Sequence, residues 1–214
     1  MKLAVLGGTG ALGQVLIAQA LAAGHEVRAL ARDPAKLPPR PGLLVVPGAM
    51  TDVGSLEALL DGADAVLSCL GVTNRKPNTE LSDATRTILG VAARIGVTRS
   101  VWVTSIGCGD SLPKLRRWVF REIIVKRLAK NIWADKDRQE AVIRDSAGDW
   151  TIVRPGGLRD EPAEVTPYQV IEGGALAQGI DTGVLDQQQA IGLRLLAVAL
   201  YQRLLQGPNI GKGG

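Results

Sequence analysis

The 214-residue sequence is poor in the side chains on which much of protein chemistry depends. It contains one histidine, His25, and two cysteines, Cys69 and Cys108, which lie far apart along the chain. So few nitrogen and sulfur ligands exclude a zinc-type metal cluster. They also exclude a catalytic triad, because His25 lies in an early turn, remote from any serine and acid that could complete it. Two cysteines do not make a disulfide framework, so we expect a reduced, cytoplasmic compartment.

Long apolar runs are absent as well. No stretch approaches the ~20 apolar residues that a membrane span needs. The first apolar run ends after Leu6, where GGTG interrupts it. That run is shorter than the ~7–15 residues of a secretory signal core, so we do not interpret the N-terminus as a signal peptide.

What the sequence does contain is an alternation of short β-branched runs and helical patterns. This alternation predicts an α/β fold, a doubly wound and mostly parallel sheet with helices on both faces. Strands are expected at KLAVLG, EVRALA, LLVVPG, DAVLSCLG, SVWVTSIG and DWTIVRPGG. Helices are expected over 11–23, 53–60 and 79–95 and within 113–146.

We expect a single domain over residues 1–214, although the alternation fails after Gly157. Residues 158–214 are therefore interpreted as a divergent, substrate-side portion. Within that portion the pattern predicts one strand near 168–172 and a helix over roughly 186–205.

A glycine-rich turn, GGTGALG, follows the first expected strand and opens the first helix. In this position glycine permits a tight turn, close approach of a pyrophosphate and close helix–strand packing. The free N–H groups of the helix N-terminus then attract the phosphate. A strand, this turn and a helix in succession predict a dinucleotide site.

Arg32 ends the second strand, about twenty residues beyond the turn, where an acid would hold the ribose 2′-hydroxyl of NADH. A guanidinium suits a 2′-phosphate instead, and charge-assisted hydrogen bonds of ~1.5–3 kcal/mol would favour NADPH about ten- to hundredfold. The alternative is a solvated surface arginine. We prefer the NADPH interpretation because Lys36 lies close by.

Several segments together resemble the atypical short-chain dehydrogenase/reductases, which bind NAD(P) on a Rossmann fold: GGTGALG, ALARDPAKL, SCLG, VTSIG and DWTIVRPGGL. RDPAKLP followed by LGVTN is most similar to the biliverdin reductase B and flavin reductase group. The resemblance covers about residues 1–160. It implies these cofactor contacts: Gly7, Thr9, Gly10, Ala11 and Leu12 at the pyrophosphate, Arg32 at the 2′-phosphate, Leu70 and Gly71 at the adenosine and ribose, and Thr104, Ser105 and Pro155 at the nicotinamide.

The sequence departs from that family at two points. Ala49 stands where an acid commonly meets the adenine, so adenine recognition falls to the surroundings of Met50. The Tyr-x-x-x-Lys pair of many short-chain dehydrogenases is missing, and Lys136 and Glu140 occupy the aligned place. Four residues apart on a helix, they would face the same way. Either they form a solvent-facing ion pair, or they serve a structural, ribose-binding or proton-relaying role.

With no strong protein acid in evidence, the resemblance favours reduction of a planar acceptor that takes its proton from solvent. FMN, FAD or a biliverdin-like tetrapyrrole would be such a substrate. Ser105 and Lys136 are the candidate catalytic residues, and Thr73, Asn74, Arg75 and Ile106 would contact the acceptor. The alternative is a non-catalytic NAD(P)H-binding redox sensor or assembly factor.

Residues 114–130 carry seven basic residues against one acid, Glu122. A helix with an apolar stripe and a solvated basic rim is the favoured interpretation. A lid over the acceptor comes second and contact with a membrane surface third. We expect no nucleic-acid partner, because no recognised module accompanies the charge. We expect a monomer or a small homo-oligomer.

Overall fold

The fold is described from a computed structural model of the chain. The structure describes residues 1–72, 74–109, 129–155, 158–159 and 191–192. Outside the described residues lie Thr73, the segment 114–128 and the strand expected near 168–172. The same holds for the helix expected over 186–205, apart from its two described positions.

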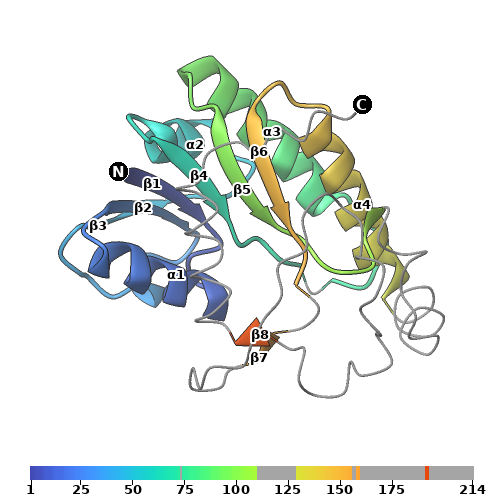
Figure 1. Cartoon of the computed structure of the whole chain (residues 1–214), viewed down its shortest axis with the longest axis horizontal. Coiled ribbons are helices and arrows are strands. Elements are labelled where there is room, and N and C mark those ends of the chain that lie inside the picture. Colours follow the sequence, from blue (N-terminus) through green and yellow to red (C-terminus); the bar gives the residue numbers. More distant parts are fainter. Residues whose placement is uncertain (73, 110–128, 156–157, 160–190, 193–214) are drawn as a thin grey trace, which may run out of the picture.

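The core of the fold is one parallel six-stranded sheet (Figure 1). Its strands are β1 (Lys2–Leu6), β2 (Glu26–Ala31), β3 (Leu43–Pro47), β4 (Ala65–Ser68), β5 (Arg99–Val103) and β6 (Asp149–Val153). They pair in the order β3-β2-β1-β4-β5-β6, and every pairing is parallel. This is the strand order of the doubly wound nucleotide-binding fold. The predicted fold class is therefore confirmed, and all six strands fall where the apolar runs place them.

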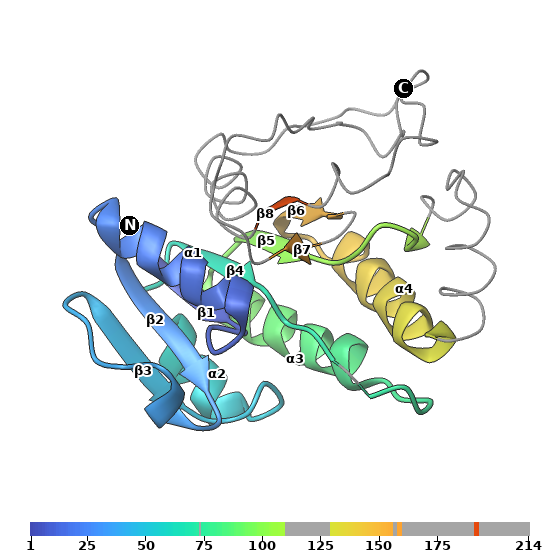
Figure 2. The ribbon, with the colours of Figure 1, turned by 90° about the horizontal axis from the view of Figure 1, so that it is seen from below.

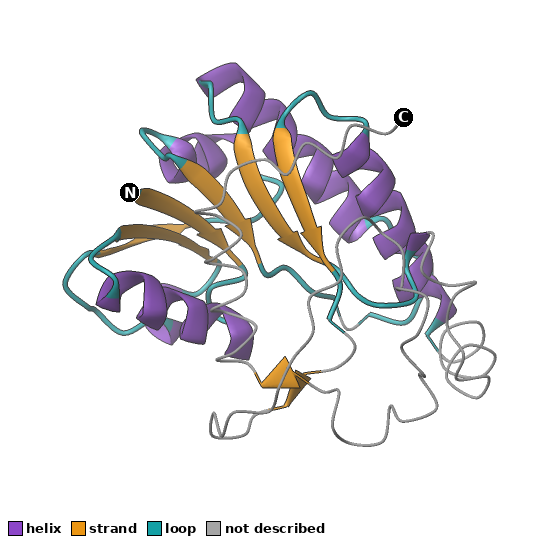
Figure 3. Ribbon diagram, viewed as in Figure 1, coloured by secondary structure: helices purple, strands orange, loops and turns teal. Residues whose placement is uncertain are grey.

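Helices cover both faces of the sheet (Figure 3). Helix α1 (Ala11–Ala22) packs on one face, where its Leu16 and Ile17 join the alternate strand residues Leu3 and Val5. Helices α2 (Val53–Leu60), α3 (Glu80–Ile95) and α4 (Lys130–Arg144) contribute to the core on the other face. A short 3-10 helix, η1 (Pro34–Lys36), follows β2. Because both faces are covered, the strands are apolar on both sides, as the sequence predicts.

The parallel strands all end at one edge of the sheet, and Figure 2 looks toward that edge. The loops that follow β1, β2, β4, β5 and β6 therefore meet there. In folds of this kind, ligands bind outside the carboxyl ends of the strands. Most of the predicted site residues fall in these loops.

Two very short strands, β7 (Leu158–Arg159) and β8 (Ile191–Gly192), form a separate parallel pair. The predicted helix over 186–205 is wrong at Ile191 and Gly192, because their backbone pairs with Leu158 and Arg159 instead of closing helical turns. The pair lies beyond the carboxyl ends of the sheet strands (Figure 1). Among the described residues, no helix combines the length and apolarity needed to cross a membrane.

Candidate functional site

The glycine turn between β1 and α1 has a shape that other residues would disrupt. Gly7 has a positive φ of 77°, and a Cβ there would lie 2.6 Å from the carbonyl oxygen of Cys69, at the end of β4. A Cβ on Gly13 would lie 2.2 Å from the carbonyl oxygen of Gly7. Both contacts are with backbone, which cannot move aside cheaply. The turn is thus pressed against β4 at one end and against its own helix at the other.

Helix α1 begins with Gly10 at its N-cap, and no side chain caps it. An α-helix leaves its first N–H groups without intrahelical partners, and such groups favour an anion. The other predicted phosphate contacts lie in the same turn. Ala11 is exposed at the first position of α1, whereas Leu12 is buried in the core, so only its backbone can serve a ligand. The carbonyl of Thr9 accepts a hydrogen bond from Gln14 Nε2 at 3.1 Å.

Arg32 is exposed and directly follows the last residue of β2. The neighbouring acid, Asp33, caps η1, because its Oδ1 accepts from the backbone N–H of Ala35 at 3.2 Å. Among the described residues, Arg32 has no ion-pair partner. Met50, the predicted adenine neighbour, is half-buried against the core on the α2 side. Asp52, close to it, caps α2 by accepting from Ser55 N–H at 3.1 Å.

The predicted nicotinamide residues gather at the ends of β5 and β6. Thr104 N–H donates to the carbonyl of Val153 at 2.9 Å, and Ile106 N–H donates to the carbonyl of Pro155 at 3.1 Å. These bonds continue the β5–β6 pairing past the strands. Ser105 lies between them and is half-buried. Leu70 and Gly71 follow β4, half-buried and exposed respectively.

Glu140 does not lie on the surface. It is 1% exposed, and its Oε1 accepts from the Thr104 hydroxyl at 2.7 Å and from Arg154 Nε at 2.9 Å. Its other oxygen, Oε2, accepts from Arg154 Nη2 and lies 3.6 Å from Arg144 Nη2. The solvent-facing ion pair considered from the sequence is therefore wrong. Both carboxylate oxygens are taken up by these partners, which join α4 to the ends of β5 and β6.

Lys136 is half-buried, and it makes no hydrogen bond to the described residues of that network. Burial lowers the pKa of its ammonium group from the ordinary value, while the acidic groups of Cys108, Glu140 and Asp135 act in the opposite direction. Cys108 is fully buried, and burial raises the pKa of its thiol to about 12. Cys108 therefore belongs to the core. A thiol this buried and this weakly acidic is a poor nucleophile.

Sequence reasoning missed two residues that build this region. Asp135 is fully buried and accepts from Leu81 N–H at 2.9 Å and from the Ser82 hydroxyl at 2.6 Å. It thereby caps α3, which has no side-chain cap of its own. Arg154, the partner of Glu140, could have been suspected from its place in VRPGG at the end of a strand. Asp135 carried no such signal, because its partners lie more than fifty positions earlier.

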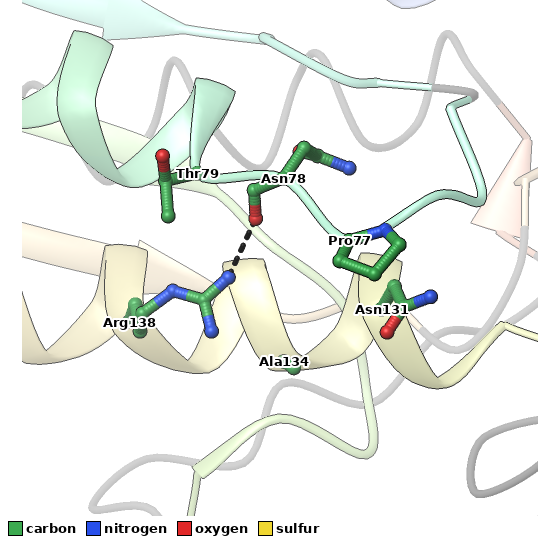
Figure 4. A pocket seen from close by; sticks show the side chains of 6 residues that line it. All are labelled: Pro77, Asn78, Thr79, Asn131, Ala134 and Arg138. Atoms are coloured by element: carbon green, nitrogen blue, oxygen red, sulfur yellow. Dashed lines mark hydrogen bonds between the residues drawn. The ribbon is translucent and has the colours of Figure 1, made fainter.

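One pocket of about 490 Å³ lies between the start of α3 and the first turns of α4 (Figure 4). It is lined by Pro77, Asn78, Thr79, Asn131, Ala134 and Arg138. None of the predicted site residues lines it, so it is distinct from the strand-end site. In the part of the chain that the structure describes, no group of three or more His, Cys, Asp or Glu residues could hold a metal ion.

Comparison with solved structures agrees with this fold. A short-chain dehydrogenase/reductase from Veillonella parvula, solved in complex with NADP, superposes with a TM-score of 0.76 at 20% identity, covering 94% of this chain and 85% of that one. ChuY, an anaerobillin reductase from Escherichia coli O157:H7, superposes with a TM-score of 0.73 at 23% identity, covering 94% and 89%. At these identities the likeness shows the fold alone.

Sequence relatives are also found. The oxidoreductase ptaF of Pestalotiopsis fici is 29% identical over 177 residues, 73% of this chain and 66% of its own. An uncharacterised protein of Mycobacterium tuberculosis is 33% identical over 106 residues, 49% of this chain but only 12% of its own length. The profile of the NAD(P)H-binding family matches residues 7–183, which is most of the chain. The glycine turn has no room for a Cβ at Gly7 or Gly13, as expected of a turn whose backbone binds the phosphates of a dinucleotide. The protein therefore belongs to the NAD(P)H-binding family.

Proposed function

We propose that this protein is an NADPH-dependent reductase that transfers hydride to a planar conjugated acceptor such as FMN, FAD or a biliverdin-like tetrapyrrole. The observation that carries the proposal is the turn in which Gly7 and Gly13 leave no room for a side chain. Such a turn leaves the N-terminus of α1 open to a pyrophosphate. Ser105, Ile106 and Pro155 lie at the same edge of the sheet, at the ends of β5 and β6.

The preference for NADPH rests on Arg32. Arg32 is exposed at the end of β2, and the Asp33 carboxylate accepts from the Ala35 N–H and caps η1. Since Arg32 has no ion-pair partner in the part of the chain that the structure describes, it can bind a 2′-phosphate through charge-assisted hydrogen bonds. NADH carries only a neutral hydroxyl at that position, which gains far less from the positive charge.

The chemistry we propose needs no strong protein acid. NADPH supplies the hydride, solvent supplies the proton, and the acceptor is reduced as the nicotinamide is oxidised. The chain's own residues would position two rings face to face, which lowers the barrier by proximity. Lys136 would hold the cofactor ribose and Ser105 would border the reacting edge. Both residues are half-buried. Ser105 lies in the loop after β5, and Lys136 lies on α4.

The acceptor class draws support from two directions. One structural neighbour, ChuY, is named an anaerobillin reductase. Asn74 and Arg75, which follow β4, are exposed, and Arg75 has no ion-pair partner among the described residues. A free guanidinium there would suit an acceptor with a phosphate or propionates. The acceptor would be a small molecule and not a nucleic acid.

The test measures turnover by the whole protein, with the loss of nicotinamide absorbance as the readout. Purified protein is mixed with NADPH and then with FMN, FAD or biliverdin, and the same series is run with NADH. We expect loss that depends on acceptor and is faster with NADPH. The Gly13→Ala variant is the matched inactive protein, because the added methyl would obstruct the turn.

A non-catalytic NAD(P)H sensor is the second candidate. It is favoured by the sequence, in which neither Tyr168 nor Tyr201 is followed four residues later by the lysine of a Tyr-x-x-x-Lys pair. Tight NADPH binding without turnover of flavins, tetrapyrroles or quinones would establish the sensor and overturn the reductase.

A further inference from the structure

Glu140 is too deeply buried to contact a ligand, yet the residues that it binds border the strand-end site. It is 1% exposed, and its Oε1 accepts from the Thr104 hydroxyl at 2.7 Å and from Arg154 Nε at 2.9 Å. Thr104 comes directly before Ser105, and Arg154 comes directly before Pro155. One carboxylate oxygen therefore holds the residue that precedes each of two proposed nicotinamide contacts.

The chain after β5 is tied to the chain after β6 on both sides of Ser105. Thr104 N–H donates to the carbonyl of Val153 at 2.9 Å, and Ile106 N–H donates to the carbonyl of Pro155 at 3.1 Å. The Thr104 hydroxyl adds the bond to the buried carboxylate on α4. Because these bonds join the two strand ends, a shift of that carboxylate is passed on to both Ser105 and Pro155.

The loop after β5 packs on the buried ion pair a second time, at Gly109. A Cβ there would lie 2.9 Å from Arg154 Nη2 and 3.0 Å from Glu140 Oε2. The φ of Gly109 is 54°, and its N–H donates to Asp137 Oδ1 at 2.7 Å. The loop therefore lies against the Glu140–Arg154 pair at both Thr104 and Gly109, so its conformation depends on that pair.

This network lies on one side of the point where the strand order reverses. A dinucleotide binds across that point in folds of this kind, and here it falls between β1 and β4. The glycine turn and Arg32 follow β1 and β2 on one side, whereas β5 and β6 lie on the other (Figure 1). Among the described residues, no hydrogen bond or ion pair of Glu140 reaches the glycine turn or Arg32. The network can thus act on one half of the dinucleotide without acting on the other.

We propose that Glu140 is a positioning residue for the nicotinamide half of the coenzyme. Through Thr104 and Arg154, its carboxylate fixes the backbone at Ser105 and Pro155, against which that half rests. This role rests on the site proposed above for the reductase, because it takes Ser105 and Pro155 as nicotinamide contacts. Glu140 itself touches no ligand, so its effect on binding passes through the two residues that it holds.

Two variants weaken the network without emptying it. Glu140→Gln keeps the size of the side chain, but its amide nitrogen cannot accept the bonds that one carboxylate oxygen accepts. Thr104→Val removes only the hydroxyl that donates to Glu140. Ile88→Val, which removes one buried methyl from α3 outside the network, is the matched control for a loss of stability alone.

Calorimetric titration of each protein uses two probes, NADPH and adenosine 2′,5′-bisphosphate. The bisphosphate carries the adenosine and the 2′-phosphate but lacks the nicotinamide half. Partial unfolding lowers the affinities for both probes alike. The ratio of the two affinities therefore isolates the contribution of the nicotinamide half, which a purely structural role of Glu140 would not change.

We expect Glu140→Gln to weaken NADPH binding about five- to fiftyfold and Thr104→Val about three- to tenfold, the effects of lost hydrogen bonds to a charged group. Both variants should bind the bisphosphate within about twofold of the wild type, and Ile88→Val should bind both probes normally. Parallel losses of the two probes, or unchanged NADPH affinity in both variants, would overturn the positioning role. If Glu140→Gln does not fold, Thr104→Val decides by the same ratio, because it retains the bond from Arg154 to Glu140.

These titrations require no acceptor, so the positioning role and the reductase can fail separately. If the wild type binds NADPH but reduces no flavin, tetrapyrrole or quinone, the reductase fails, and the positioning role stands on the affinity ratio. If the wild type binds NADPH no more tightly than the bisphosphate, the nicotinamide half gains nothing at the strand ends. The positioning role then falls, and turnover alone judges the reductase.

Discussion

The Thr104 hydroxyl donates a hydrogen bond to the carboxylate of Glu140 at 2.7 Å, although 36 positions separate the two residues. Thr104 directly follows β5, and Glu140 lies in the third turn of α4, so the bond joins the sheet edge to the helix. Arg154, directly after β6, donates to the same carboxylate. One buried acid thus connects three elements at the edge where the cofactor is expected.

Replacing Glu140 by alanine should destabilise the protein severely. The variant removes the buried carboxylate to which Arg154, whose side chain is only 13% exposed, donates. Removing one partner of a buried ion pair typically costs about 3–5 kcal/mol. The free energy of unfolding in urea measures the effect. Glu57→Ala is the control, because Glu57 and Arg94 are 49% and 57% exposed and such a pair contributes about 1 kcal/mol or less. Equal losses in the two variants would contradict the role assigned to Glu140.

The sheet and its covering helices could be predicted from local sequence. Alternating apolar runs place all six strands, and helix α2 has the bounds expected for it, Val53–Leu60. Local pattern suffices here because each strand and helix buries its own apolar residues. The glycine turn is equally local, since strand, turn and helix follow one another within residues 2–22.

The buried polar network could not be predicted in the same way. The four-residue spacing correctly placed Lys136 and Glu140 on neighbouring turns of one helix. It could not say that Glu140 turns inward, because that depends on Arg154 and Thr104, which reach α4 only in the folded chain. Asp135 was overlooked for the same reason, since Leu81 and Ser82 come from another helix. Ile191 was assigned to a helix by its periodicity, and pairing with Leu158 overrides that preference.

Gly13→Ala should abolish NADPH binding. The new methyl would lie 2.2 Å from the Gly7 carbonyl oxygen and 2.7 Å from the Gly8 Cα, so the turn must open. Calorimetric titration with NADPH measures the loss. Gly90→Ala is the matched control, because a Cβ at this position inside α3 meets nothing within 4 Å. It should bind NADPH normally and gain about 0.5–1 kcal/mol in unfolding free energy from better helix propensity. Normal NADPH binding by Gly13→Ala would contradict the proposal that the glycine turn binds the pyrophosphate.

Arg32→Ala should lower the affinity for NADPH much more than the affinity for NADH. Without the guanidinium, NADPH affinity should fall about ten- to hundredfold, whereas NADH affinity should change by less than about threefold. Titration of both nucleotides into wild type and variant gives the ratio. Arg86→Ala, which alters an exposed arginine on α3, should leave both affinities unchanged. Parallel losses of NADPH and NADH in Arg32→Ala would refute the 2′-phosphate contact.

Lys136→Met should lower cofactor affinity without lowering stability at neutral pH. Burial lowers the pKa of the Lys136 ammonium below 10.5, which means that its charged form is disfavoured in the folded chain. Methionine fills similar space without that charge, so the variant should be as stable as the wild type or more stable. NADPH affinity should fall about two- to tenfold if Lys136 holds the ribose.

The same substitution carries a pH signature with a definite sign. Between the lowered folded-state pKa and 10.5, the unfolded chain binds more protons at Lys136 than the folded chain does. The wild type therefore gains stability as pH rises through that window, and the Lys136→Met variant lacks this gain. The variant's relative stability should be greatest at low and neutral pH and should decline as pH approaches 10.5. Urea unfolding of both proteins at pH 7 and about pH 10 measures the difference. A stability difference that does not change with pH, or a variant destabilised at pH 7 by more than about 1 kcal/mol, would show that the Lys136 charge is not penalised by burial.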